Sequence, residues 1–318
     1  MSRDSYPVPA VAGEPGAASR LLFLFLDGVG LGADDPQVNP LAAARLNTFE
    51  RLGGGPLTAS LREQAEPGRV VRRLDAGLGV AGLPQSATGQ TALLTGHNAA
   101  LLMGRHYGPW PGPTLKRALD AGTLFSEVLG AGGRARLSNV YPPGYFGAIA
   151  SGQRRANVPV YAALGAGLPL LTLEDYEGGA GVSVDLTGAY LGRLLPELRG
   201  WTPQEQGARL ARQAATQTFT FFDFWPSDDA GHRGDFGGAL RLLDALDGLL
   251  EGVLAELGDT TLVIVSDHGN LEDKTRRSHT SAPVPLLVTG PQAGAFADAR
   301  TLLDVAPAVR RALGLAHG

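Results

Sequence analysis

The sequence contains no cysteine among its 318 residues. Disulfide bonds and thiolate catalysis are therefore excluded, and any metal site must use histidine and carboxylate ligands. Lysine is almost absent as well, with only Lys116 and Lys274. The formal charge of −4 gives no excess of positive charge of the kind that binds nucleic acid. An anionic substrate stays possible, because bound metal ions can supply positive charge locally.

Long apolar runs are also absent. No stretch reaches the roughly 20 residues that a membrane-spanning helix needs, and the first residues lack the apolar segment of a secretory signal. We therefore expect a cytoplasmic protein with no membrane partner. Residues 1–19 are rich in Pro, Gly, Ala and Ser without periodicity, which predicts a disordered tail. The composition carries no signal for an oligomeric state.

Short continuous apolar runs alternate with helical patterns. Such runs are typical of buried parallel strands, and they occur at residues 21–27, 134–140, 218–224, 261–267 and 284–289. The clearest helical patterns cover residues 203–216 and 235–257. This alternation predicts an α/β fold with a mostly parallel central sheet and helices on both faces. We expect one domain over residues 20–318, with an irregular insertion or rudimentary cap at about 141–200.

Polar side chains stand at the ends of three predicted strands. Asp27 follows the first run, Asp228 and His232 follow the third, and Asp267 and His268 follow the fourth. In an open α/β sheet, ligands bind beyond the carboxyl ends of the strands, so we expect these side chains to share one edge. Asp228 and His232 are four residues apart and can face the same side of a helical turn.

His279 adds a third imidazole, in a Ser-His-Thr-Ser loop before the last strand. Three aspartates and three histidines then form a set that suits Zn²⁺ or Mn²⁺ better than Ca²⁺ or Mg²⁺. Each residue alone has a structural explanation, since Asp27 and Asp228 could cap helices and His268 could be a buried core histidine. Their joint occurrence at strand ends favours a metal site.

Several motifs resemble the alkaline phosphatase superfamily. They are DGVGLG after the first strand, SDDAGH, and SDHGNLED followed by HTSAPVPLLVTG. The nearest resemblance is to cofactor-independent phosphoglycerate mutases and phosphopentomutases, and it extends from residue 21 to the closing LLDVAPAVRRALGL helix. The resemblance implies an alkaline-phosphatase-like fold and two divalent metal ions, Mn²⁺ or Zn²⁺. It implies one ion held by Asp228, His232 and His279, and another held by Asp27, Asp267, His268 and the Ser86 oxygen.

The resemblance also implies a serine or threonine nucleophile at the start of a helix. In the string LPQSATGQTALLTG, Ser86 aligns with this nucleophile and Thr88 is the alternative. A helix N-terminus favours a bound phosphate and an alkoxide. Arg105 could hold a substrate phosphate, although a solvated surface arginine is the alternative. Asn39 lies in a DDPQVNPLA loop that resembles one near the metal in relatives, and it is a second candidate for substrate binding.

The reaction class depends on the length of the insertion. The mutases carry a large cap that keeps water away from the phosphoryl group during transfer. Residues 141–200 are too few for such a cap, so the sequence favours a two-metal phosphohydrolase that acts on a small phosphorylated substrate through phosphoserine at Ser86. The substrate could be a phosphomonoester, a phosphodiester or a sulfate ester. The alternatives are a phosphomutase of the phosphoglycerate mutase or phosphopentomutase kind and a non-catalytic metal-binding scaffold.

Overall fold

The computed structural model describes residues 19–194, 196–198 and 200–315. The tail predicted at residues 1–19 lies outside the described residues except for its last position. Within the described chain, seven strands form one sheet in the order β2-β3-β7-β6-β1-β5-β4. The strands are β1 (Leu21–Leu26), β2 (Gln64–Glu66), β3 (Arg69–Leu74), β4 (Ala135–Leu137), β5 (Phe219–Phe224), β6 (Thr261–Ser266) and β7 (Val284–Thr289).

The centre of the sheet is parallel. β1 lies between β5 and β6 and pairs in parallel with both, and β4 pairs in parallel with β5. The predicted mostly parallel α/β sheet is therefore confirmed. β7 runs antiparallel to β6, because the residues between them contain no crossover helix of the kind a parallel connection needs. The β2–β3 hairpin, which the apolar runs did not predict, extends the sheet beyond β7.

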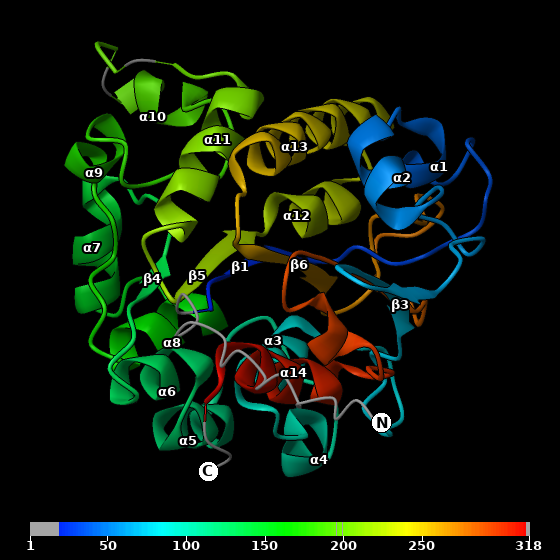
Figure 1. Ribbon diagram of the computed structural model, residues 1–318, viewed down its shortest axis with the longest axis horizontal. Coiled ribbons are helices and arrows are strands. Elements are labelled where there is room, and N and C mark those ends of the chain that lie inside the picture. Colours follow the sequence, from blue (N-terminus) through cyan, green and yellow to red (C-terminus); the bar gives the residue numbers. More distant parts are fainter. Residues whose placement is uncertain (1–18, 195, 199, 316–318) are drawn as a thin grey trace, which may run out of the picture.

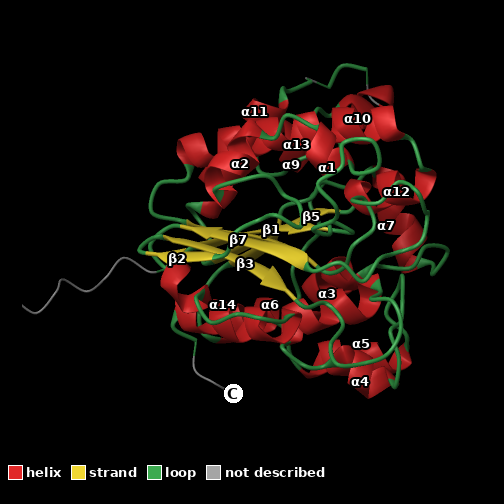
Figure 2. Cartoon of the chain, turned by 90° about the vertical axis from the view of Figure 1, so that its right-hand side faces the viewer, coloured by secondary structure: helices red, strands yellow, loops and turns green. Residues whose placement is uncertain are grey.

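Helices cover both faces of the sheet, as Figures 1 and 2 show. One face carries α3 (Ser86–Thr95), α4 (Ala99–Met103), α5 (Pro113–Ala121), α6 (Leu124–Gly130), α8 (Val158–Gly165) and α14 (Val305–Leu313). The other carries α1 (Pro40–Ala43), α2 (Asn47–Gly53), α11 (Pro203–Ala214), α12 (Pro226–Arg233) and α13 (Phe236–Glu256). The remaining elements are α7 (Pro143–Ala150), α9 (Leu173–Glu177), α10 (Ala189–Leu194), η1 (Ala293–Phe296) and η2 (Leu302–Asp304). No described helix combines the length and apolar character required to cross a membrane.

The strand β1 contributes to a core on each face of the sheet. All six of its residues are buried, because successive side chains point to opposite faces and both faces are covered. Phe23 and Phe25 join the core on the α3 face, whereas Leu22 and Leu24 join the core on the α13 face. Burial of each side chain of this size stabilises the folded state by about 1.5–3 kcal/mol. Asp27 directly follows this strand, so the packing of the strand holds its backbone in place.

The predicted insertion at residues 141–200 contains short helices. α8 belongs to the main body, because Val158 and Val160 lie in the core on the α3 face. Other apolar side chains of this region gather in a separate small cluster, which includes Leu171, Tyr176 and Leu191. One part of the segment thus completes the core of the sheet and another part packs on itself. Its interpretation as a rudimentary cap stays a prediction.

Candidate metal centre

The carboxyl ends of the three central strands bring the candidate ligands together. Asp27 directly follows β1, and Asp267 and His268 directly follow β6 on the neighbouring strand. The helix α12 comes soon after β5, and Asp228 lies in its first turn and His232 in its last. His279 lies in the loop that precedes β7.

The ligand atoms form two overlapping groups in the described chain. Atoms of Asp228, His232 and His279 lie within 4.8 Å of one another, and so do atoms of Asp27, Asp228 and His268. Asp267 adjoins the second group, with Oδ2 3.5 Å from Nε2 of His268. The structure therefore brings together all six of the predicted Asp and His ligands. Asp228 belongs to both groups, whereas the resemblance implied a role at one ion alone.

Each of two histidines directs Nε2 into the cluster. Nδ1 of His232 lies 2.6 Å from the Arg277 carbonyl oxygen, and Nδ1 of His279 lies 2.8 Å from the Pro84 carbonyl oxygen. An Nδ1–H that donates to a carbonyl leaves Nε2 with a lone pair for a metal. The two Nε2 atoms are 3.2 Å apart. Two ligands of one tetrahedral Zn²⁺ ion, with bonds of about 2.0–2.1 Å, would be about 3.3 Å apart.

Ser86 faces this cluster from the first turn of α3. Its Oγ lies 3.0 Å from Nε2 of His268. In the described part of the chain, the backbone N–H groups of Ser86 and Ala87 make no hydrogen bond, as is usual for the first turn of a helix. The Thr88 hydroxyl instead donates to the Gln85 carbonyl oxygen at 2.9 Å, and Thr88 is fully buried. Of the two predicted nucleophiles, Ser86 is the one whose hydroxyl contacts a candidate ligand.

Burial and crowding of the carboxylates shift several pKa values. Burial, and then the charge of Asp267, raises the pKa of Asp27 to about 8. Burial also raises the pKa of Asp267 to about 6. Burial alone would lower the pKa of His268, but the carboxylates of Asp267 and Asp27 raise it to about 10. Oδ1 of Asp27 is buried without a hydrogen bond. This oxygen lies 3.3 Å from Nε2 of His268. Cations at this position would relieve the repulsion between the carboxylates, so the residues fit a metal site.

Two amide side chains hold these ligands in place. Nε2 of Gln90 donates to Oδ2 of Asp27 at 3.0 Å and to Oδ2 of Asp267 at 3.2 Å. Nδ2 of Asn270 donates to Oδ1 of Asp228 at 2.6 Å. Sequence reasoning missed both residues. The available signal for Gln90 was its position four residues after Ser86, which places both side chains on one face of α3.

The buried Glu272 carboxylate fixes the loops around the centre. It accepts hydrogen bonds from the Gly30 amide at 3.0 Å and from the Asn270 amide at 2.8 Å. Its other oxygen accepts a hydrogen bond from the Thr280 hydroxyl. Glu272 thus joins the loop after β1 to the loop that carries His279. It supports the ligands and is not a member of either group.

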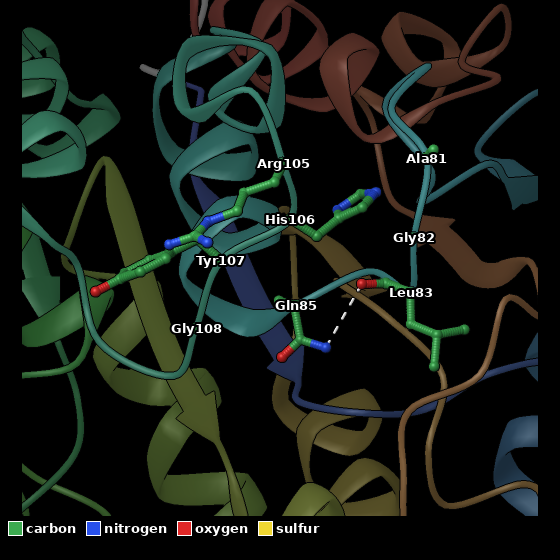
Figure 3. A pocket seen from close by; sticks show the side chains of 8 residues that line it. All are labelled: Ala81, Gly82, Leu83, Gln85, Arg105, His106, Tyr107 and Gly108. Carbon is green, nitrogen blue, oxygen red and sulfur yellow. Dashed lines mark hydrogen bonds between the residues drawn. The ribbon is translucent and has the colours of Figure 1, made fainter.

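Asn39 and Arg105 lie outside the ligand cluster. Asn39 is the N-cap of α1, and its side chain accepts from the Leu41 amide at 2.9 Å and donates to the Ala33 carbonyl at 2.7 Å. Both its polar groups are therefore used in a fully buried cap. Arg105 is exposed in the loop after α4, and it lines a pocket beside Gln85, the residue before Ser86 (Figure 3).

Comparison with known sequences supports a metalloenzyme. Residues 201–317 match the model of the Metalloenzyme superfamily. The chain is 36% identical over 93 residues to a 2,3-bisphosphoglycerate-independent phosphoglycerate mutase of Yersinia pestis (strain Pestoides F), across 26% of this chain and 18% of the relative. The chain thus matches less than a fifth of the length of that mutase.

Comparison with solved structures supports the fold over nearly the whole chain. Alkaline phosphatase from the Antarctic bacterium TAB5 aligns with a TM-score of 0.57 and 12% identity, over 94% of this chain and 99% of that one. A cold-active alkaline phosphatase from a psychrophilic Shewanella species aligns with a TM-score of 0.51 and 12% identity, over 92% and 99%. The fold is therefore alkaline-phosphatase-like.

Proposed function

Since this chain carries a domain of the metalloenzyme superfamily, we propose that it is a two-metal phosphohydrolase that acts through a phosphoserine at Ser86. The observation that carries the proposal is the position of the Ser86 hydroxyl. It lies at a helix N-terminus with unbonded amides and faces a cluster of carboxylates and imidazoles. A helix N-terminus binds phosphate, and a neighbouring cation activates a hydroxyl.

The six Asp and His side chains would hold two ions, for which we propose Mn²⁺ or Zn²⁺. Asp228, His232 and His279 would hold one ion. Asp27, Asp267 and His268, with the Ser86 oxygen, would hold the other. When bound, the ions would lower the pKa of the Ser86 hydroxyl and neutralise charge on the phosphate oxygens.

The residues of this chain supply binding and the nucleophile. The free amides of Ser86 and Ala87 would donate to phosphate oxygens at the N-terminus of α3. Ser86 Oγ forms a bond to phosphorus and gives up its proton to water as the ester P–O bond breaks. The leaving oxygen takes a proton from water. Water then cleaves the phosphoserine, which releases phosphate and restores the hydroxyl. Gln90 keeps Asp27 and Asp267 oriented throughout.

A phosphomutase is the second candidate, and the sequence similarity to phosphoglycerate mutase favours it. Hydrolysis is supported by residues 141–200, which form short helices, one of them built into the main core. A site without a large cap admits water to the phosphoserine. The two reactions differ in one product, because a mutase moves the phosphoryl group between substrate positions without releasing phosphate.

The test is hydrolysis of 4-nitrophenyl phosphate by protein loaded with Mn²⁺ or Zn²⁺. We expect Ser86→Ala to lower kcat by at least about 10³-fold, because removing the nucleophile of a covalent mechanism has an effect of this size or larger. The matched variant Thr88→Ala should keep most of the activity, because that hydroxyl bonds to the backbone of Gln85 and Tyr107 and to none of the candidate ligands. Unaltered turnover in Ser86→Ala would remove Ser86 from the mechanism. A panel of phosphomonoesters, phosphodiesters and sulfate esters then defines the ester class.

A further inference from the structure

A pocket of about 470 Å³ lies beside the start of α3. Two short segments line it, one around Leu83 and one around His106 (Figure 3). The volume falls within the range of small-molecule sites and far exceeds that of a three-carbon unit such as glycerate. None of the proposed metal ligands lines it.

The pocket adjoins the nucleophile through two of its lining residues. Gln85 immediately precedes Ser86. Gly108 packs over the helix N-terminus so closely that a Cβ on it would lie 3.3 Å from the backbone nitrogen of Ser86. Gln85 and Gly108 therefore belong to the wall of the pocket and also lie next to the N-terminus of α3. A leaving group that extends from Ser86 toward Gln85 would meet this pocket.

The polar groups of the pocket suit an anion. In the described chain, the Arg105 guanidinium makes no ion pair and no side-chain hydrogen bond, and it lies 5.7 Å from the centre of the Tyr107 ring. The amide of Gln85 and the imidazole of His106 line the same space, and no carboxylate does. His106 donates from Nε2 to the Val80 carbonyl at 3.1 Å, so its buried Nδ1 is an acceptor, and Arg105 supplies the positive charge of the lining.

The rest of the lining is apolar. The ring of Tyr107 lies beside the Arg105 guanidinium, whereas Ala81 and Leu83 lie on the opposite side of the pocket (Figure 3), and Leu83 is 41% exposed. A guanidinium fork matches a carboxylate or phosphate group, whereas the apolar wall needs a carbon skeleton to cover it. The pocket thus suits a ligand that has an apolar body and one anionic terminus.

We propose that this pocket binds the leaving group of the substrate, and that Arg105 selects a phosphate ester whose leaving group has an apolar body and a second anionic group. The inference rests on the proposed phosphohydrolase activity. Arg105 is then a residue that determines specificity and does not act on phosphorus. The second anion is distinct from the reacting phosphate, which lies at Ser86.

The experiment compares kcat/KM for 4-carboxyphenyl phosphate and 4-carbamoylphenyl phosphate, which share shape and differ in charge. The charge preference is the kcat/KM for the carboxy ester divided by that for the carbamoyl ester. Comparing this ratio between the native protein and a variant cancels the different reactivity of the two esters. We expect Arg105→Gln to lower the ratio about tenfold, mainly through KM, because a charge-assisted hydrogen bond is lost. Arg105→Lys should recover part of the ratio, since it keeps the charge without the fork. Arg117→Gln, an exposed arginine on α5 that bonds to Thr114, is the matched control and should leave the ratio unchanged.

A third substrate and a direct binding measurement test the same inference. We expect 3-phosphoglycerate, a small ester with the same two charges, to have a lower kcat/KM than 4-carboxyphenyl phosphate, because it leaves the apolar wall uncovered. A ratio that does not change in Arg105→Gln, or a preference for 3-phosphoglycerate, would overturn the inference. If unsubstituted phenyl phosphate is not hydrolysed either, the proposed function fails instead. Calorimetric binding of 4-carboxyphenyl phosphate to the native protein and to Arg105→Gln then decides the inference separately, with equal affinity counting against it.

Discussion

Gln90 contacts two buried carboxylates with a single amide group. It lies one turn after Ser86 on α3 and donates to both Asp27 and Asp267. Such partners orient ligands and tune their basicity, and losing one typically costs about 10–100-fold in metal affinity. Here the partner comes from the same helix as the proposed nucleophile, so the geometry of α3 positions the hydroxyl and the carboxylates together.

Replacing Gln90 should therefore weaken metal binding without removing a ligand. We expect Gln90→Leu to lower the affinity for Mn²⁺ or Zn²⁺ by about 10–100-fold, measured by calorimetric titration of the metal-free protein. Thr91→Val is the control, because the Thr91 hydroxyl bonds only to the Ala87 carbonyl within the helix. Equal affinities in the Gln90 variant and the native protein would contradict the role given to Gln90.

The sequence predicted the candidate ligands better than the residues that hydrogen-bond to them. Asp27, Asp228 and Asp267 were found because they follow strands that converge on one edge of the sheet. The sequence favoured Ser86 and kept Thr88 as the alternative, since both hydroxyls lie in the first turn of one helix and only their orientation distinguishes them. Gln90 was missed because an amide in a helix has no pattern that marks the charges it will meet.

The start of α2 depends on a side chain from another helix. The residue at its N-cap, Leu46, has no side-chain acceptor. The Asp247 carboxylate on α13 accepts from the Thr48 and Phe49 amides, each at 3.0 Å. A negative group at a helix N-terminus satisfies free N–H groups and interacts favourably with the helix dipole. Asp247 thus joins two helices that are distant in sequence.

We expect Asp247→Ala to lower the free energy of unfolding by about 1–2 kcal/mol, the usual cost of losing a helix cap. Urea denaturation measures this value. Asp244→Ala is the matched control, because Asp244 is exposed on the same helix. The activity per folded molecule should not change. A loss no larger than that of Asp244→Ala would show that α2 does not need this cap.

The elements themselves were predicted to different degrees. The pattern at residues 235–257 matches α13 within one residue at each end, and Thr202 caps α11 in a capping box with Glu205. The direction of β7 was not predictable, because a buried apolar run has the same appearance in either direction. The β2–β3 hairpin was missed because β3 contains three arginines and β2 is a short polar strand at the edge of the sheet.

Across the whole molecule, metal binding and pH are linked through the buried carboxylates. The pKa values of Asp27 and Asp267, about 8 and about 6, lie above the usual value of 3.8. The folded metal-free protein therefore binds more protons than the unfolded chain over the interval from about 4 to about 8. Its stability should fall as the pH rises through that interval. Metal ions need the deprotonated groups, so their stabilising effect should grow over the same interval.

We therefore expect Mn²⁺ or Zn²⁺ to raise Tm more at pH 8 than at pH 5.5, at equal metal concentration, in thermal unfolding followed by circular dichroism. Asp228→Asn should lose most of this increase, because Asp228 belongs to both ligand groups. Asp229→Asn is the control, since Asp229 pairs with Arg233 at the surface. A shift of Tm that is independent of pH would count against metal binding by these carboxylates.

The position of β1 also has a consequence for how the chain is made. β1 is synthesised before the other described strands, yet its two neighbours in the sheet begin at Phe219 and Thr261. Until those strands are synthesised, an apolar hexapeptide remains without its partners, and such long-range pairing makes folding slow. The portion that matches the superfamily, residues 201–317, contains β5 and β6 but not the strand between them. Expressed alone, that portion would lack the strand between β5 and β6. The nascent chain therefore reaches its native sheet only when β1 pairs with β5 and β6.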